Sequence, residues 1–309
     1  MPPITSIAIV GLGALGILYG DFFERALGAS QVTFLADAKR CRRYRQAAVT
    51  CNGRRCRFGF ATPQEYAEKH GAAELLLFAV KGTTLEQAVE EMRPVVGSGT
   101  AILSVLNGIT SEEVIEAHYH EGAVVHCVAQ AMDALRDGTT VTYSRIGELR
   151  IGITEHTPAK IAALRRIEEF FDRTRFAYRT EDDILRRMWC KWMLNVGVNQ
   201  TVAVCAGTFH DVQVPGAARE RMKAAMREVV AVARASGIAL TEADLNEYVA
   251  IIDTLMPEGM PSMRQDTLAQ RETEVELFAG TVIRKAAALK IEVPVNQMLY
   301  RALKALPHR

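Results

Sequence analysis

The sequence of 309 residues carries almost no net charge and lacks the composition of several protein classes. Its 37 Lys and Arg against 36 Asp and Glu leave a net charge of +1, so we expect no nucleic-acid partner held by bulk charge. With 49% hydrophobic residues, it is neither disordered nor collagen-like. It has no internal repeat, low-complexity tract or long linker. At about 150 residues per domain, this length predicts two domains.

Cysteine and histidine are too scattered for a disulfide framework or a metal site. The six cysteines, none in a Cys-x-x-Cys pair, are Cys41, Cys51, Cys56, Cys127, Cys190 and Cys205. Free thiols of this kind are typical of a reducing compartment, so we expect a cytoplasmic protein. Between Cys51 and Cys56, Asn52-Gly53 predicts a hairpin turn rather than a disulfide. We interpret His118, His120 and His126 as surface or core side chains, because they straddle a predicted helix end and the next strand.

Long apolar runs of the kind that cross membranes are also missing. Two stretches without charge, 1–20 and 192–210, approach the length of a membrane span, which is about 20 residues. The first is interrupted by four glycines and has no basic start of a signal peptide. The second contains Asn195, Asn199 and Gln200, which are costly in lipid. We therefore expect a soluble protein without a membrane partner.

A glycine-rich turn follows the first predicted strand, 4–10, and a helical pattern then runs to about Leu27. The turn reads Gly11-Leu12-Gly13-Ala14-Leu15-Gly16. Strand, glycine turn and helix in this order are typical of a dinucleotide site. The first glycine allows the tight turn, the second lets the pyrophosphate approach the backbone, and the third lets the helix pack on the strand. We predict that these six residues bind a dinucleotide on the free N–H groups of the helix.

The rest of the first half alternates short apolar runs with helical patterns, which predicts a parallel sheet covered on both faces. The expected strands are 31–36, 74–80 and 101–107, with a helix at 83–92. Three later strands, 123–131, 139–143 and 147–153, have little helix between them and should complete the sheet as an antiparallel or mixed edge. A helix at 158–172 follows.

From about Thr180 the pattern is helical only. Thr180 is expected to cap a helix that runs toward Ala206. Further helices are expected at 215–236, 241–255, 272–290 and 295–306. The predicted fold is therefore an α/β Rossmann-type domain, residues 1–179, and an all-α substrate and catalytic domain, residues 180–309, with the active site between them.

The choice of cofactor is expected to depend on the end of the second strand, where two signals conflict. Asp37 stands 21 residues after Gly16, where an acid would bond the ribose hydroxyls of NAD. The basic residues between positions 36 and 57 are Lys39, Arg40, Arg42, Arg43, Arg45, Arg54, Arg55 and Arg57. Lys39 or Arg40 would suit the 2′-phosphate of NADP. A solvated helix face explains the basic run equally well, so both readings stay open.

A polar stripe marks the first helix of the second half. Lys191, Asn195 and Asn199 follow one another at four-residue steps, so they share one helix face. Their neighbours are Trp, Met, Leu and Val, which favours a cleft over open water. A cation and two amides buried together are costly unless they find partners. The alternative is a snorkelling lysine with amides that cap neighbouring loops.

These motifs, together with Asn107-Gly108 and the segment Ser262-Met263-Arg264-Gln265-Asp266 followed by Glu274, resemble the ketopantoate reductase (2-dehydropantoate 2-reductase) family. The resemblance extends over nearly the whole chain. Many families share the glycine motif, whereas Lys-x-x-x-Asn-x-x-x-Asn and Ser-Met-x-Gln-Asp are much more specific. The resemblance implies reduction of 2-dehydropantoate, a small 2-keto acid, to pantoate by NADPH, on the route to pantothenate and coenzyme A.

The resemblance also implies catalytic roles for two residues. Lys191 matches the lysine that protonates the keto oxygen as hydride arrives, and Glu274 matches a glutamate that assists. The chemistry suits a lysine, because a donor must meet the developing alkoxide and a free lysine titrates at about 10.4. Glu274 would orient Lys191 or bond the substrate. Its alternative is a solvated acid in the opening turns of a helix.

Binding roles follow in the same way. Asn195 and Asn199 match amides that hold substrate hydroxyls, and Ser262 matches the hydroxyl that binds the substrate carboxylate. Asn107 matches the turn beside nicotinamide and substrate, and Lys81 a lysine near the cofactor. Taken alone, Ser262 reads as a helix N-cap, Asn107 as the end of a strand, and Lys81 as an exposed loop charge.

The chain departs from the family pattern at two places. Many members end the second strand with an arginine, where this chain has Ala36-Asp37, so NADH is not excluded. A further asparagine ten residues after Asn199 is Phe209 here, which favours another branched 2-keto acid as the alternative substrate. A non-catalytic NADP-binding sensor protein is a third reading. The sequence is compatible with a homodimer.

Overall fold

The computed structural model describes residues 2–120 and 122–307 and forms two compact units. The first contains Met1–Leu106 and Thr110–Ile184, and the second contains Asn107–Ile109 and Leu185–Arg309. The sequence predicts a division after residue 179, whereas the contacts divide the chain after Ile184. The difference arises because residues 178–180 form a strand of the first unit's sheet.

The first unit is built on a sheet of eight strands in the order β12-β11-β8-β7-β6-β1-β2-β5. The strands are β1 (Ile7–Val10), β2 (Val32–Leu35), β5 (Gly59–Ala61), β6 (Leu75–Phe78), β7 (Ala101–Ser104), β8 (Ala123–Gln130), β11 (Glu148–Gly152) and β12 (Tyr178–Thr180). Neighbours are parallel except β8 and β11, which are antiparallel. The predicted parallel sheet with a mixed edge is confirmed.

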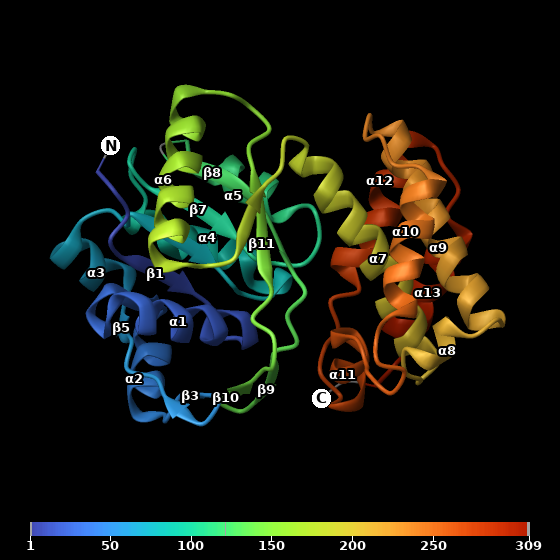
Figure 1. Ribbon diagram of the computed structural model, residues 1–309, viewed down its shortest axis with the longest axis horizontal. Coiled ribbons are helices and arrows are strands. Elements are labelled where there is room, and N and C mark those ends of the chain that lie inside the picture. The colour runs from blue at the N-terminus through green and yellow to red at the C-terminus, as the bar shows by residue number, and fades with distance from the viewer. Residues whose placement is uncertain (1, 121, 308–309) are drawn as a thin grey trace. The chain divides into compact units, whose positions relative to one another are not determined.

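Helices cover both faces of this sheet (Figure 1). One core packs beneath α1 (Ala14–Leu27) and α6 (Pro158–Thr174). A second core packs beneath α3 (Pro63–His70), α4 (Leu85–Met92) and α5 (Ser111–His118). The central strands are buried on both faces, which explains why they read as continuous apolar runs in the sequence.

A second, small sheet has the order β4-β3-β10-β9. Its strands are β3 (Thr50–Cys51), β4 (Arg54–Arg55), β9 (Leu135–Asp137) and β10 (Thr140–Thr142). Asn52 and Gly53 have φ values of 46° and 76°, so the predicted hairpin turn is confirmed, and the two flanking cysteines are free. The strand predicted at 139–143 lies in this sheet rather than at the edge of the large one.

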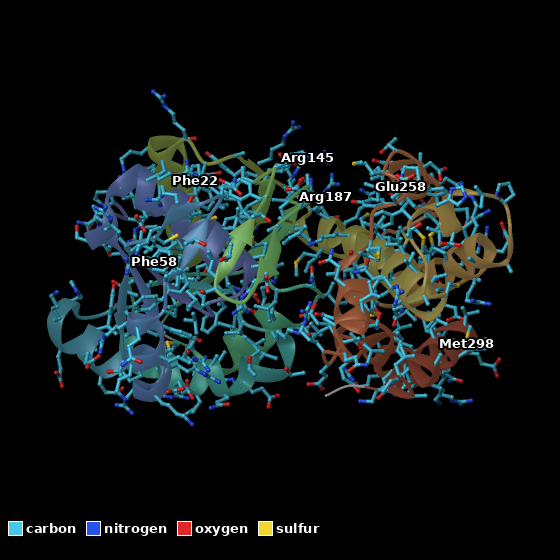
Figure 2. The ribbon with its side chains drawn as sticks, turned by 90° about the horizontal axis from the view of Figure 1, so that it is seen from below. Phe22, Phe58, Arg145, Arg187, Glu258 and Met298 are labelled. Atoms are coloured by element: carbon cyan, nitrogen blue, oxygen red, sulfur yellow. The ribbon has the colours of Figure 1, made fainter. Side chains whose placement is uncertain are left out.

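Buried acids of α1 hold this hairpin in place. Arg54 donates to Asp21 and to Glu24 Oε1, the latter at 2.8 Å, and both acids are more than nine-tenths buried. Glu24 Oε2 also accepts from the backbone N–H groups of Arg57 and Phe58. The ring of Phe58, which Figure 2 labels, packs on that of Phe34, with ring centroids 4.4 Å apart. The contacts of Arg54 therefore stabilise the fold of the first unit.

All the regular secondary structure in the described residues of the second unit is helical. Its elements are α7 (Ile184–Val204), α8 (His210–Gln213), α9 (Ala217–Ala235), α10 (Glu242–Asp253), α11 (Ser262–Leu268), the π-helix η4 (Glu276–Gly280), α12 (Thr281–Leu289) and α13 (Pro294–Lys304). The predicted fold class, an α/β domain followed by an all-α domain, is confirmed.

Two details of the helical prediction are wrong. Thr180 ends β12 instead of capping a helix, and α7 begins at Ile184, because Thr180 pairs with Ile151 in the sheet. The single helix predicted at 272–290 is divided into η4 and α12 and begins only at Glu276.

No helix in the described part of the chain combines the length and apolarity that a membrane crossing needs. Residues 2–120 and 122–307 contain no group of three His, Cys, Asp or Glu side chains arranged to hold a metal ion.

Candidate active site

The glycine turn between β1 and α1 is shaped by close backbone contacts. Gly11 has φ +104°, and a Cβ there would lie 2.5 Å from the Ala79 carbonyl oxygen. A Cβ on Gly16 would lie 2.0 Å from the Gly11 carbonyl oxygen. Both positions therefore require glycine, the first for the turn and the third for packing of helix on strand.

Gly13 differs from its neighbours because the space around it is open. A Cβ there would meet only the Ala79 oxygen, at 3.5 Å. Gly13 is the N-cap of α1 and supplies no side-chain cap, so the first N–H groups of this 14-residue helix keep their capacity to bind an anion. A pyrophosphate needs this combination of close backbone approach and free N–H groups. The residues of the turn fit a dinucleotide.

Lys81 lies at the same edge of the sheet. Gly11 packs against Ala79 and Val80, the residues that follow β6, and Lys81 comes next in the chain. The Lys81 side chain is exposed, and its backbone oxygen accepts from Thr84. The fold thus brings Lys81 to the end of the sheet where the glycine turn lies.

Asp37 caps the helix α2 (Ala38–Gln46) that follows β2. Its Oδ1 accepts from the backbone N–H of Arg40 at 2.7 Å, and its Oδ2 lies 3.4 Å from Arg40 Nε. Lys39 is exposed in the same first turn. Both carboxylate oxygens of Asp37 are thus engaged by Arg40, whereas the Lys39 side chain is exposed in the first turn of α2.

In the second unit, α7 carries the predicted polar stripe. Asn195 and Asn199 are only 8% and 6% exposed. Neither amide forms a hydrogen bond with the residues that the structure describes. Arg187, one turn before Lys191, donates to Tyr248 Oη at 3.1 Å. The two amides therefore remain available to a ligand, which does not fit the alternative of loop-capping amides.

Asn107 joins Lys191 to Glu274. Lys191 Nζ donates to Asn107 Oδ1 at 3.3 Å, and Asn107 Nδ2 donates to Glu274 Oε2 at 3.2 Å. These bonds span 84 and 167 positions of the sequence. The ammonium and the carboxylate fix the orientation of the amide, because each can bond only one of its ends. All three residues belong to the second unit.

The local structure excludes two of the alternatives for these residues. Asn107 lies three residues beyond the end of β7 at Ser104, so it does not terminate the strand. Glu274 is half-buried in the segment before η4, so it is not a solvated acid in a helix. Both side chains are carried by irregular segments and meet only in the folded unit.

Ser262 and Phe209 lie at the starts of two short helices of the same unit, α11 and α8. Ser262 is exposed and is the first residue of α11, whose N-cap is Pro261, so Ser262 is not itself the cap. The Phe209 backbone N–H donates to the Gly259 oxygen at 2.9 Å. A Cβ on Gly259 would lie 3.0 Å from the Phe209 ring. Phe209 therefore packs against the loop that leads to Ser262.

Several buried polar residues were missed by sequence reasoning. Gln200 is fully buried and donates to Asn296 Oδ1 at 3.3 Å. Asn296 in turn donates to Glu228 Oε2 at 2.7 Å. The amide at position 200 was the available signal, but its partners Ala279 and Asn296 lie 79 and 96 positions further along the chain.

Glu112 and His126 are two of the buried titratable side chains of the first unit. Glu112 is 2% exposed, and burial raises its pKa to about 7 although Ser111 Oγ donates to it at 2.8 Å. Burial lowers the pKa of His126, and its Nδ1 has no hydrogen-bond partner among the described atoms. Both groups favour their neutral forms because charge is poorly solvated there.

The chain matches two family models. One, described as ketopantoate reductase PanE/ApbA, matches residues 7–156, and one described as the ketopantoate reductase PanE/ApbA C terminal matches residues 183–307. A 2-dehydropantoate 2-reductase of Streptococcus pyogenes is 23% identical over 234 residues, which are 75% of this chain and 76% of the relative.

Solved structures share the fold over nearly the full chain. D-mandelate dehydrogenase with NADH and anilino(oxo)acetate superimposes with a TM-score of 0.83 at 19% identity, covering 97% of each chain. A dimeric ketopantoate reductase from Staphylococcus aureus gives a TM-score of 0.77 at 22% identity, covering 97% of this chain and 98% of that one. At these identities the likeness is one of fold.

Proposed function

The chain belongs to the ketopantoate reductase PanE/ApbA family, and on this premise we propose that it reduces 2-dehydropantoate to pantoate with NADPH. The family assignment makes it an oxidoreductase. The observation that carries the finer proposal is the hydrogen-bonded set of Lys191, Asn107 and Glu274. An ammonium held at a fixed point is the donor that reduction of a keto group requires.

In the proposed reaction, Lys191 gives the proton that completes the alcohol. NADPH, when bound, supplies the hydride. As the carbonyl carbon gains hydride, the carbon–oxygen π pair moves onto oxygen, and a proton passes from Lys191 Nζ to that oxygen. The lysine is left as a neutral amine and regains its proton from solvent. Asn107 and Glu274 keep the ammonium oriented before transfer.

The substrate would be held by side chains of the second unit. Asn195 and Asn199 continue the face of Lys191 along α7 and offer amides to substrate hydroxyls. The Ser262 hydroxyl, exposed at the start of α11, would bind the carboxylate. A small 2-keto acid with a hydroxyl group satisfies these three donors together.

NADPH is the preferred cofactor in this proposal. Asp37 already serves as the cap of α2 and is paired with Arg40. Its carboxylate is therefore less available to bond a ribose hydroxyl. Lys39 is exposed in the same turn and would meet a 2′-phosphate, with Arg40 beside it. Gly11 to Gly16 would hold the pyrophosphate, and Lys81 would lie near the cofactor. NADH is the alternative, supported by the NADH-bound dehydrogenase of the same fold.

A second candidate substrate is another branched 2-keto acid. Phe209 stands where an amide is expected for contact with the far end of ketopantoate, and its ring lies against the loop before Ser262. A benzyl side chain cannot donate a hydrogen bond and favours an apolar substrate end. This observation therefore favours a substrate other than the ketopantoate that the family resemblance implies.

Steady-state kinetics test both candidates. Ketopantoate, 2-ketoisovalerate and phenylglyoxylate are assayed with NADPH and with NADH, followed by nicotinamide absorbance. We expect the highest kcat/KM for ketopantoate with NADPH. Phe209→Asn is the matched variant, because it restores the amide, and it should raise kcat/KM for ketopantoate only. Binding of NADPH without turnover of any 2-keto acid would instead support a sensor protein.

The proposed enzyme is also compatible with a homodimer. The Staphylococcus aureus ketopantoate reductase of this fold is dimeric. Light scattering on a sizing column decides the question, with the 34.1 kDa chain as the reference mass. A single peak at the mass of one chain would remove the dimer from the proposal.

A further inference from the structure

A tryptophan next to Lys191 ties α7 to the segment that carries Glu274. Trp192 Nε1 donates to the Leu277 carbonyl oxygen at 2.8 Å. The Trp192 side chain is among the largest fully buried ones, with 1% exposure. A hydrogen bond made by so deeply buried a donor is expensive to lose, because water cannot readily replace its partner.

Leu277 is one hydrogen bond away from Glu274. Its own backbone N–H donates to the Glu274 carbonyl oxygen at 3.0 Å. Gly108, the neighbour of Asn107, also packs there, since a Cβ on it would lie 3.6 Å from Leu277 Cβ. The segments of Glu274, Asn107 and Lys191 therefore converge on one peptide unit.

The segment after Glu274 has an unusual backbone that needs support. η4 is a π-helix, in which the Gly280 N–H reaches back to the Val275 oxygen at 3.0 Å. Such turns are rare and occur mainly at functional sites. They are less stable than an α-helical turn unless the surrounding structure holds them.

A second residue of α7 supplies such support two turns further along. Gln200 Oε1 accepts from the Ala279 backbone N–H at 3.0 Å. The Gln200 amide nitrogen is held in turn by the Val196 oxygen at 2.7 Å and by Asn296 Oδ1. Gln200 has 0% exposure, so its orientation is set by these partners alone.

We propose that Trp192 and Gln200 are positioning residues, which hold η4 and thereby keep Glu274 within hydrogen-bond reach of Asn107. The contacts form a closed ring that runs from Lys191 through Asn107, Glu274 and Leu277 to Trp192, the neighbour of Lys191. Because the ring is closed, the spacing of Lys191 and Glu274 depends on the indole bond. The inference rests on the proposed function of these two residues.

The chain supplies a matched control for the indole. Trp189 lies on the same helix, is 5% exposed and packs edge-on against Trp192 with centroids 5.1 Å apart. No hydrogen bond from its indole N–H is found in the described part of the chain. Trp192→Phe and Trp189→Phe thus remove the same atoms from neighbouring buried positions, and only the first removes the bond to Leu277.

The test compares kcat, KM and the pH profile of both variants with those of the wild type. A displacement of about 1 Å at a catalytic group can cost about 10²-fold, so we expect Trp192→Phe to lower kcat by at least about tenfold. The KM for NADPH should stay within about twofold, and the kcat–pH profile should shift as Glu274 loses its contact with Asn107. Trp189→Phe should leave kcat and the profile within about twofold of the wild type.

Equal kcat values and pH profiles for the two variants would overturn the inference, because a packing loss alone would then explain both. Thermal melting shows whether each variant is folded. If Trp192→Phe does not fold, Gln200→Met removes the other tie at similar volume and is held to the same expectation. A wild-type enzyme that reduces no 2-keto acid would refute the proposed function itself, an outcome distinct from equal variants of an active enzyme.

Discussion

The two units build their sites from different parts of the chain. In the first, six consecutive residues form the glycine turn that is proposed to bind the dinucleotide through its backbone N–H groups. In the second, Asn107, Lys191 and Glu274 come from three distant segments and meet through side chains. A site made from backbone leaves a contiguous pattern in the sequence, whereas a site made from side chains exists only after folding.

The units also differ in the use of buried polar groups. Asp21 and Glu24 of the first unit hold a hairpin to its helix. Gln200 and Asn296 of the second unit are fully buried and connect α7 to η4 and α13. Burial of polar groups therefore supports the fold of the first unit and the candidate site of the second.

The largest expected effect comes from the side-chain site. Lys191→Met keeps the length and apolar contacts of the side chain but removes the proton. We expect kcat to fall by about 10²–10⁴-fold, the usual contribution of a general acid, with little change in the Kd of NADPH. Stopped-flow absorbance measures the first and fluorescence titration the second.

Lys285→Met is the matched control for Lys191→Met. Lys285 is also half-buried in the helical unit, and its ammonium lies 5.8 Å from the centroid of the Trp189 ring. The Lys285→Met variant should keep at least half of the wild-type kcat. An unchanged kcat in Lys191→Met would show that this lysine takes no part in the mechanism. The second unit would then lack the side-chain site that distinguishes it from the first.

Substitutions at two glycines of the turn should have different effects, one on the stability of the fold and the other on cofactor affinity. Gly16→Ala forces a Cβ to 2.0 Å from the Gly11 oxygen, so we expect a loss of unfolding free energy of about 3 kcal/mol. Gly13→Ala meets nothing closer than 3.5 Å and should fold normally. Its methyl group would obstruct the pyrophosphate, at a cost of about 1.4 kcal/mol, which is about tenfold in Kd. Urea unfolding and cofactor titration measure the two effects, and equal stability losses would contradict the distinction.

The smallest effect concerns Glu112, a buried acid of the first unit that lies outside both sites. Its pKa is raised to about 7 in the fold, so the native state holds the proton more tightly than the unfolded chain. Stability from this group is full below about pH 4.5 and is lost as pH rises toward about 7. Glu112→Gln cannot ionise, so its melting temperature should exceed that of the wild type at pH 8 but not at pH 5.

The expected gain at pH 8 is at most about 3 kcal/mol, the free-energy equivalent of the raised pKa. Glu113→Gln is the control, since Glu113 is exposed on the same helix. It should show no such difference between the two pH values. A Glu112→Gln profile parallel to the wild type would show that burial does not favour the neutral acid.

Much of the first unit, and one feature of the second, can be predicted from local sequence. The apolar runs 74–80 and 101–107 predict buried strands, because strands covered on both faces have no polar side. The stripe of Lys191, Asn195 and Asn199 is visible because helix geometry alone aligns residues four apart. These features depend on neighbours along the chain.

The rest depends on distant partners. β12 is short and mostly exposed, so nothing in its sequence outweighs the helix-capping pattern at Thr180. Helical periodicity does not distinguish η4 from an ordinary turn, since one extra residue leaves the apolar pattern nearly intact. The partners of Asn107 lie 84 and 167 positions away, and only the family resemblance pointed to them.

The path of the chain limits how this protein can be taken apart. Residues 107–109 group with the helical unit although both flanking segments belong to the first, so the chain passes between the units three times. A protease that cuts near residue 184 severs only one of three covalent tethers. A fragment ending there would keep Asn107 but lose Lys191 and Glu274, so neither half expressed alone would contain the complete triad.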